Sequence, residues 1–331
     1  MSGKTVGIYL NTFSQFKRKK GKTKGQEAPL RALAKGLQER HGYKVKLLHT
    51  VEDTDIDIAL MFNYWSSNKP NHSRELVWRH CKKNNIPLFV EDAGVFTSFM
   101  ADNKERAKAR ILESWQFHRL GLNSCLGTGL YFNKNSDDKQ FKFLQSQFDN
   151  LKIDNWKKDG KEILIIAQNP IGFQYQGSLS YNSWLIDTID KIKLITDRPI
   201  KVRLHPRSVW NESKQDRKLV TFKEDERVKL SHLQGRFNFF EDLDNVYCAV
   251  THSSSAAVDS ILKGVRTIIT SDRCITHAGL EKVWQDNLTD IEIPVYPERE
   301  QWAYNLAYTS FTNEQFKEIV PERFLQGLNM L

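Results

Sequence analysis

The residues best suited to chemistry in this sequence stand where predicted strands end. Residues 200–208 (IKVRLHPRS) alternate apolar and polar positions and then reach His205 and Pro206. Proline has no backbone N–H to donate to a neighbouring strand, so the predicted strand ends at His205. In an open α/β sheet, ligands bind at the carboxyl ends of the strands. His205, with Arg203 and Arg207 beside it, is therefore predicted to bind a phosphate group; the alternative is a surface histidine between solvated arginines.

A second predicted strand, residues 246–250 (VYCAV), leads into one histidine and three consecutive serines. These are His252, Ser253, Ser254 and Ser255. A predicted helix, residues 256–263, follows directly and is ended by Gly264. Hydroxyl groups and free backbone N–H groups at a helix N-terminus converge on an anion. We predict that these four residues bind the same phosphorylated ligand, although one serine alone would suffice as a helix cap.

Two adjacent carboxylates follow a third predicted strand, residues 86–90 (IPLFV). They are Glu91 and Asp92, and the next residues are Ala93 and Gly94. A carboxylate at the end of a buried strand, before a glycine that permits a sharp turn, can act as a general base. The alternative is a pair of exposed turn residues or a helix cap. The sequence leaves open whether Glu91 or Asp92 is the catalytic carboxylate.

A run of basic residues, 17–24 (KRKKGKTK), follows the first predicted strand, and six of its eight residues are Lys or Arg. They are Lys17, Arg18, Lys19, Lys20, Lys22 and Lys24. The run belongs to the first loop of a predicted strand-helix-strand unit, so it lies at the carboxyl edge of the sheet. The whole chain has a net charge of +9 and a pI near 9.2. Together with this charge, the basic run predicts a polyanionic acceptor; the alternative is that the run is a solvated, disordered loop.

Residues 114–134 show no clear periodicity and carry aromatic residues, glycines and the pair His118 and Arg119. Irregular segments of this kind often carry binding functions. We predict that His118 and Arg119 also contact the acceptor. The hydrophilic residues 133–161 are the predicted connection between two domains.

Strand and helix patterns alternate along the chain. Strands are predicted at residues 4–10, 43–49, 56–62, 86–90, 162–167, 200–205, 246–250 and 265–270, and helices at 28–40, 73–84, 183–195, 256–263, 302–307 and 313–320. This order predicts an α/β protein with two Rossmann-like domains facing a central cleft. We expect an N-terminal acceptor-side domain over residues 1–150, a nucleotide-binding domain over 151–305 and a helical segment over 306–331.

Length and composition agree with two domains and exclude several classes of protein. The 331 residues are 40% apolar and 27% charged, an ordinary globular composition that suits two domains of about 150 residues. No run of about 18 apolar residues and no signal peptide occurs, so a cytoplasmic protein without a membrane span is expected. The four cysteines, Cys81, Cys125, Cys248 and Cys274, form no CxxC pair, so neither a structural zinc site nor a disulfide framework is predicted.

The order of the three strand-end motifs resembles that of known glycosyltransferases. Residues 91–94 (EDAG), 203–206 (RLHP) and 252–255 (HSSS) are similar to motifs of bacterial sialyltransferases and polysialyltransferases, and of the Kdo transferases of the capsule-polysaccharide synthesis family. The resemblance covers scattered patches of residues 86–275. It implies a GT-B fold in which the acidic motif supplies a catalytic carboxylate, the histidine of the HP motif contacts the donor phosphate and the serines contact the nucleotide.

Carried over, these roles fall on Asp92 or Glu91, on His205 and on residues 253–255. If the reaction inverts the configuration at the anomeric carbon, the carboxylate removes the proton of the acceptor hydroxyl while cations and N–H groups stabilise the departing phosphate. No divalent metal and no cofactor is required beyond the nucleotide-sugar co-substrate. Ala93 interrupts the acidic motif, which leaves open which carboxylate acts, and RLHP replaces a lysine form, which leaves the donor nucleotide, UDP or CMP, open. The sequence decides neither the stereochemistry nor the oligomeric state.

Three acceptor hypotheses arise from the sequence. Residues 117–134 also resemble a stretch in phage-encoded proteins of this broad group. Together with the basic run, this resemblance favours hydroxymethylated bases of phage DNA as the acceptor. Such a protein is expected to act in the host cytoplasm. The first alternative is a capsular or lipopolysaccharide glycan, for which no amphipathic membrane face is evident. The second is a non-catalytic nucleic-acid-binding protein, for which no helix-turn-helix, zinc or RNP signature occurs.

Overall fold

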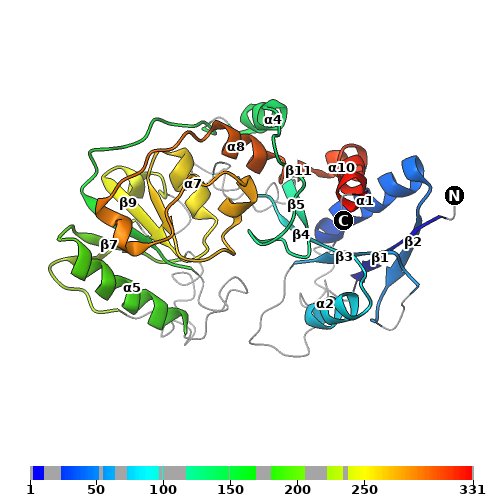
Figure 1. The fold of residues 1–331 in the computed structure, drawn as a ribbon, viewed down its shortest axis with the longest axis horizontal. Coiled ribbons are helices and arrows are strands. Elements are labelled where there is room, and N and C mark those ends of the chain that lie inside the picture. The colour runs from blue at the N-terminus through cyan, green and yellow to red at the C-terminus, as the bar shows by residue number, and fades with distance from the viewer. Residues whose placement is uncertain are drawn as a thin grey trace.

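A computed structural model describes residues 3–10, 24–51, 55–63, 73–96, 99, 117–148, 150–168, 180–205, 222–233 and 238–329. These residues form two α/β domains that lie side by side along the long axis of the molecule (Figure 1). Each domain is built on its own sheet, of six strands in the first domain and five in the second. The predicted α/β class with two sheet-based halves is confirmed.

The first sheet has the order β11-β5-β4-β3-β1-β2. Its strands are β1 (Thr5–Tyr9), β2 (Lys44–Leu48), β3 (Ile58–Phe62), β4 (Leu88–Ala93), β5 (Phe117–Leu122) and β11 (Phe311–Thr312). Strands β1 to β4 are parallel, whereas β5 runs antiparallel to β4. Helix α1 (Lys24–His41) contributes Leu30 and Leu33 to the core on one face, and α2 (Ser73–Lys83) contributes Val77 to the core on the other.

The second sheet is parallel throughout, in the order β10-β9-β6-β7-β8. Its strands are β6 (Glu162–Ile166), β7 (Ile200–Arg203), β8 (Val228–Leu230), β9 (Val246–Thr251) and β10 (Thr267–Ile269). Its helices are α5 (Tyr181–Ile195), α7 (Ala256–Leu262) and the 3₁₀ helices η4 (Glu241–Leu243), η5 (Ile275–Gly279) and η6 (Leu288–Glu292). From β6 the chain builds outward through β7 and β8, then crosses to β9 on the other side of β6. The strand order therefore reverses between β6 and β9, which is where such sheets bind ligands.

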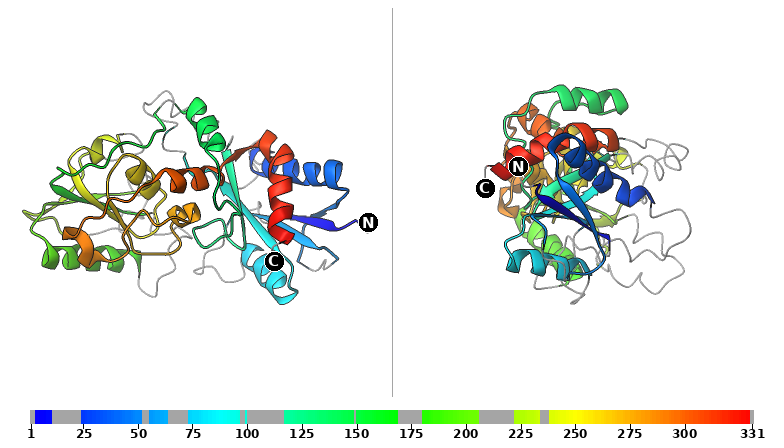
Figure 2. Two further views of the ribbon diagram at one scale, coloured as in Figure 1. Left: turned by 45° about the horizontal axis from the view of Figure 1, so that its top comes forward. Right: turned by 90° about the vertical axis from the view of Figure 1, so that its right-hand side faces the viewer.

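The end of the chain returns to the first domain (Figure 2). After α8 (Glu300–Ala307), strand β11 pairs with β5, and α9 (Asn313–Glu318) and α10 (Val320–Asn329) pack against α1. Helix α9 begins with a capping box in which Thr312 and Gln315 exchange hydrogen bonds. On this packing we propose that the returning helices belong to the first domain.

The two domains are in direct contact. One hydrophobic cluster contains Phe117 of β5, Phe141 of α4 (Lys139–Gln147), and Ile261 and Trp302 of the second half of the chain. In addition, the Gly127 N–H donates to the Arg273 carbonyl oxygen at 3.1 Å. A Cβ atom at Gly127 would lie 2.0 Å from the Cys274 carbonyl oxygen, so only glycine fits at this contact.

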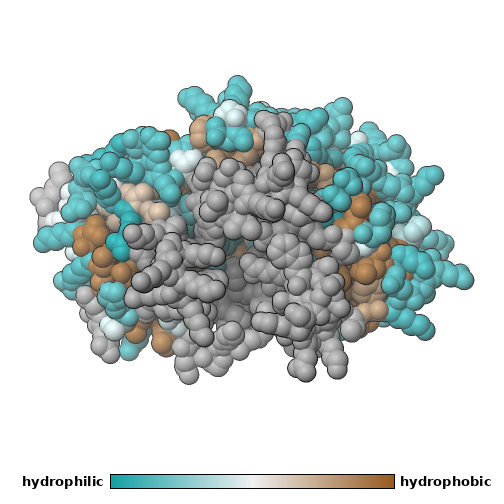
Figure 3. All heavy atoms as spheres, turned by 180° about the vertical axis from the view of Figure 1, so that it is seen from behind, coloured by the Kyte–Doolittle hydropathy of each residue, from teal (hydrophilic) through white to brown (hydrophobic). Residues whose placement is uncertain are grey.

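The surface of the described residues is mostly hydrophilic. On the side shown in Figure 3, hydrophilic residues make up most of the coloured surface toward both ends of the molecule, and smaller hydrophobic patches lie among them. None of the helices that the structure describes combines the length and the apolar character needed to cross a bilayer.

Replacing Gly127 with Ala should weaken the contact between the domains, because the added methyl group collides with backbone oxygen atoms of Asp272 and Cys274. We expect the free energy of unfolding in urea to fall by roughly 1–3 kcal/mol. Gly42→Ala is the comparison variant: its methyl group has open space, but the residue has a φ of +70°, and the expected cost is only about 1 kcal/mol. A Gly127→Ala protein as stable as the wild type would contradict this interface.

Candidate active site at the facing edges of the two sheets

Gln168 joins the two strands at the point where the order of the second sheet reverses. It follows β6 and is buried, and its Oε1 accepts the backbone N–H of Ser253 at 3.0 Å. Its Nε2 also lies 2.9 Å from Ser253 Oγ. The Ser253 hydroxyl, predicted to bind the donor, is therefore buried and held by Gln168, and we correct its role to a structural one. Gln168 was missed, although it follows its strand as His205 follows β7.

His252 is half-buried at the end of β9. Its Nδ1 lies 3.1 Å from Ser253 Oγ, and its ring meets Trp184 edge to face at 5.6 Å. Trp184, in the first turn of α5, donates its indole N–H to Thr270 Oγ1 at 3.1 Å. Burial, and then the nearby positive charge of Arg273, lower the pKa of His252 to about 4. At neutral pH it is therefore an uncharged imidazole, able to donate or accept one hydrogen bond at each nitrogen according to its tautomer.

Ser254 and Ser255 lie at the start of α7 and are more accessible than Ser253. Ser254 Oγ accepts the Ala256 N–H at 3.3 Å, and the Ser254 carbonyl oxygen accepts from Cys274 Sγ at 3.3 Å. The Ser255 side chain is exposed and makes no capping hydrogen bond. These two hydroxyls, rather than that of Ser253, are in a position to reach a ligand.

Arg203, predicted to contact the donor, is buried at the end of β7 and hydrogen-bonded within the second domain. It is 4% exposed, and its guanidinium donates to the carboxylate of Asp242 and to the Leu233 carbonyl oxygen. Asp242 is completely buried and also accepts from the Ser231 hydroxyl at 2.7 Å. A guanidinium with these buried partners holds the end of β7 in place, so the donor contact predicted for Arg203 is corrected.

His205 lies beyond the end of β7 and is half-buried. Since the Ala167 N–H donates to the Arg203 carbonyl oxygen at 2.9 Å, β7 ends level with β6. The parallel arrangement of β7, β6 and β9 therefore brings His205, Gln168 and His252 to the same edge of the sheet. Arg207, the third predicted donor-binding residue of this strand end, lies outside the described residues.

In the first domain, Asp92 lies directly opposite Arg119 in the antiparallel pair of β4 and β5. Arg119 Nη2 donates to Asp92 Oδ2 at 2.7 Å, Nη1 donates to the Ala93 carbonyl oxygen at 2.5 Å and Nε donates to the Cys125 carbonyl oxygen at 2.6 Å. The Asp92 side chain retains 17% of its surface exposed, against 7% for Arg119. Arg119 therefore orients a carboxylate that solvent can reach, and the acceptor contact predicted for Arg119 itself is corrected.

Glu91 and His118 lie on the opposite face of the sheet. Glu91 Oε1 is 2.6 Å from His118 Nδ1, and neither side chain has any exposed surface. The His118 ring meets Phe316 of α9 edge to face, and burial raises the pKa of Glu91. A residue with no exposed surface cannot contact an acceptor in this structure, so the prediction for His118 is corrected. Of the two adjacent carboxylates, only Asp92 is accessible.

A short loop connects the acid of the first domain with the ligand edge of the second. Cys125 Sγ lies 4.0 Å from Asp92 Oδ2, and two residues later Gly127 hydrogen-bonds to the carbonyl oxygen of Arg273. Arg273 is close enough to His252 to lower the pKa of that histidine. The Asp92 edge of the first sheet and the His252 edge of the second therefore adjoin the same interdomain contact.

The basic run predicted to bind the acceptor lies outside the described residues at Lys17, Arg18, Lys19, Lys20 and Lys22. Lys24 is the first residue of α1, but its side chain is also outside the described part. Among the residues that the structure describes, no group of three or more His, Cys, Asp or Glu side chains could hold a metal ion.

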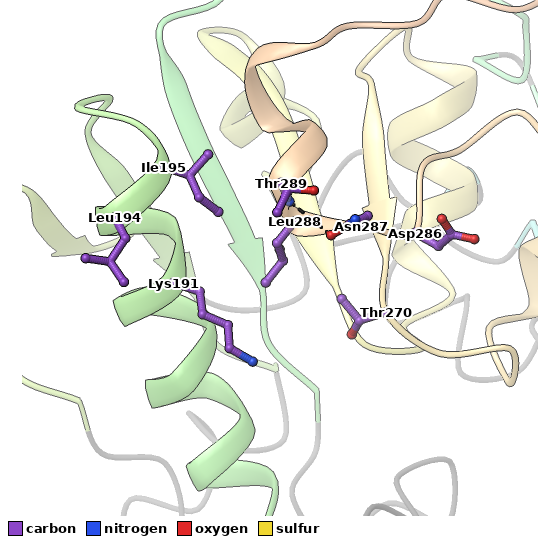
Figure 4. A pocket seen from close by; sticks show the side chains of 8 residues that line it. All are labelled: Lys191, Leu194, Ile195, Thr270, Asp286, Asn287, Leu288 and Thr289. Atoms are coloured by element: carbon purple, nitrogen blue, oxygen red, sulfur yellow. Dashed lines mark hydrogen bonds between the residues drawn. The ribbon is translucent and has the colours of Figure 1, made fainter.

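A separate open hollow of about 430 Å³ lies between α5 and residues 286–289, which include the start of η6. Figure 4 shows Lys191, Leu194 and Ile195 of α5 on one side and residues 286–289 on the other. Thr270 lines it as well, and the same Thr270 hydroxyl accepts the Trp184 N–H. The hollow therefore lies next to the aromatic side of the candidate site.

Comparison with solved structures finds two structures of KpsC from Thermosulfurimonas dismutans that are similar to this chain. Its "beta Kdo 2,4 transferase" has a TM-score of 0.51 and 13% identity, over 94% of this chain and 92% of that one. Its "beta Kdo 2,7 transferase" has a TM-score of 0.44 and 11% identity, over 98% and 99% of the two chains. No family model matches the sequence, and no curated protein sequence matches it. The first likeness shows the fold: two Rossmann-like domains of the GT-B type, as the sequence predicted.

The lowered pKa of His252 should make the protein sensitive to acid. Because the unfolded histidine titrates near its ordinary value of 6.5 and the folded one at about 4, the unfolded state binds the proton first as the pH falls through this window. When the pH is lowered from about 7 to 5, the free energy of unfolding should fall in both proteins. The fall should be about 1–2 kcal/mol smaller in His252→Asn than in the wild type. Urea denaturation at both pH values measures this difference. The exposed His49 is the control, and His49→Asn should behave as the wild type; equal acid sensitivity of His252→Asn would contradict the assignment.

Proposed function

We propose that this chain is a glycosyltransferase that moves a sugar from a nucleotide-sugar donor to a hydroxyl group of a polyanionic acceptor. The observation that carries the proposal is the position of Asp92. It is the accessible carboxylate of the acidic pair, it is oriented by Arg119, and it lies beside the loop that contacts the second domain at Gly127. The strand-order reversal at β6 and β9 supports a nucleotide site across from it.

The donor side of the site is assigned to His205, His252, Ser254 and Ser255. These residues offer imidazole and hydroxyl hydrogen bonds to phosphate oxygens at the carboxyl edge of the second sheet. His252 contributes without a charge of its own, because its imidazole is neutral at pH 7. Titration of the protein with UDP and with CMP distinguishes the two possible donor nucleotides.

In the transfer step, an acceptor hydroxyl oxygen attacks the anomeric carbon of the donor sugar. Asp92 takes the hydroxyl proton as the new C–O bond forms. The bond between the anomeric carbon and the phosphate oxygen breaks, and its electron pair leaves with the nucleotide phosphate. Hydrogen bonds from His205 and the α7 start stabilise that developing charge.

For the acceptor we propose DNA with hydroxymethylated bases. The net charge of +9 and the basic residues 17–24 support it, since cationic loops bind nucleic acid by releasing counterions from phosphates. The target base would have to leave the helix stack to reach Asp92. Such a protein would be phage-encoded and act in the cytoplasm of the host. If the protein does not bind DNA, a capsular or lipopolysaccharide glycan is the acceptor that we propose instead.

Asp92→Asn should abolish transfer and preserve donor binding. Removing the proton acceptor should lower kcat by about 10²- to 10⁴-fold, whereas the nucleotide affinity should stay within about twofold, because the nucleotide is assigned to the other domain. Glu91→Gln is the matched control, since Glu91 lies in the core with His118, and it should keep most of the activity. Transfer assays with a radiolabelled sugar and nucleotide titrations measure both quantities. If Glu91→Gln abolishes transfer while Asp92→Asn remains active, the general base is Glu91 instead of Asp92.

Binding to duplex DNA should fall steeply with added salt. If the six basic residues of 17–24 each neutralise one phosphate, affinity should drop by roughly 10³-fold between about 50 and 200 mM salt. Replacing Lys17, Arg18, Lys19 and Lys20 with Ala should reduce the slope of log affinity against log salt by about 3 to 4. The control replaces four exposed, ion-paired lysines elsewhere: Lys35, Lys139, Lys142 and Lys282. A wild-type protein that does not bind DNA at low salt would favour the glycan acceptor.

A further inference from the structure

Arg273 is a half-buried cation that forms no ion pair with the described residues. Its Nη1 group is buried and has no hydrogen-bond partner, and its guanidinium makes no ion pair, within the described part of the chain. Four buried arginines use most of their N–H groups on carboxylates or carbonyl oxygens: Arg119, Arg203, Arg266 and Arg299. Burying part of a charged group without a partner costs free energy, which a bound anion would offset.

The backbone around Arg273 is fixed from both domains. Its carbonyl oxygen accepts the Gly127 N–H of the first domain, and its own N–H lies 3.3 Å from Ser271 Oγ. The next residue, Cys274, donates from Sγ to the carbonyl oxygen of Ser254 at 3.3 Å. Arg273 is therefore held at the carboxyl edge of the second sheet, next to the start of α7 and at the interdomain contact.

The residues around Arg273 also belong to the donor side of the site. Arg273 is close enough to His252 to disfavour a positive charge on that imidazole. The adjacent Asp272 acts on His252 in the opposite sense, but it is exposed and forms no ion pair with Arg273 in the described residues. A fixed positive charge thus remains uncompensated beside His252 and Ser254, where the proposed function places a phosphate.

We propose that Arg273 binds the phosphate group of the nucleotide-sugar donor and offsets the negative charge that forms on it as the sugar leaves. This inference rests on the proposed function and goes beyond it by assigning the cation of the donor site. Arg203, which the sequence suggested for that role, is occupied by Asp242. A guanidinium can donate two parallel hydrogen bonds to phosphate oxygens, a geometry that neither a hydroxyl nor a neutral imidazole provides.

The test compares nucleotide and nucleoside binding in Arg273→Gln, Arg273→Lys and the wild type. Isothermal titration measures UDP and CMP, and thermal shift measures uridine and cytidine at millimolar concentration. Arg273→Gln should weaken the nucleotide that the wild type prefers by about 10- to 100-fold, as expected for loss of a charge-assisted hydrogen bond. Its nucleoside shift should be unchanged, because the nucleoside has no phosphate. Arg273→Lys should be intermediate, since lysine keeps the charge and loses the two-pronged geometry.

The control is Arg79→Gln on α2, where the arginine is exposed and paired with Glu75; its nucleotide affinity should equal that of the wild type. If Arg273→Gln does not fold, Arg273→Lys, which keeps the charge, carries the test. Unchanged nucleotide affinity in the folded variant, or an equal loss for nucleotide and nucleoside, overturns the role of Arg273 while leaving the proposed function standing. If the wild type binds neither nucleotide, the proposed function fails and this inference fails with it.

Discussion

The hydrogen bonds of Arg119 determine the layout of the first half of the site. A buried guanidinium must find acceptors for its N–H groups, and those of Arg119 come from Asp92, Ala93 and Cys125. The first two keep β5 paired to the end of β4, and the third shapes the loop that reaches Gly127. One side chain therefore orients the accessible carboxylate and supports the segment that contacts the second domain. Without it, Asp92 would keep only the Ala93 N–H and the long contact with Cys125 Sγ, and the loop would lose the hydrogen bond at the Cys125 carbonyl oxygen.

The arginines of this fold differ in function according to their partners, and sequence neighbours do not reveal those partners. Arg203 precedes the His-Pro pair, which made it a candidate for phosphate binding. Its true partner, Asp242, lies 39 residues further along the chain, a distance over which no local pattern operates. Arg273 attracted no prediction, because its significance lies in having no ion pair within the described residues. Pairing of charges over long sequence distances is a property of the folded state alone.

The same limit explains which parts of the fold could be predicted. Strands β6 and β9 and helix α5 were predicted closely, because each buries an uninterrupted apolar run or a clear helical stripe. Strand β5 was not predicted, since His118 and Arg119 place polar side chains in the interior and only their carboxylate partners on β4 make that burial tolerable. The choice between Glu91 and Asp92 stayed open for a related reason. Alternation along β4 sends the two side chains to opposite faces, but only the packing of α9 shows which face is closed.

The interdomain contact limits how the two halves of the site can move. Domains that meet only through a flexible linker can change their separation freely, but here the cluster around Phe117 and Trp302 spans both domains. At Gly127 the backbones of the two domains approach so closely that no side chain fits. Since this loop also meets Asp92 at one end and Arg273 at the other, a shift of one domain would disturb the acid and the donor cation together. We infer that the proposed catalytic carboxylate and the proposed phosphate-binding edge are held in a fixed relation, which favours a site formed before the substrates bind over one assembled by domain closure.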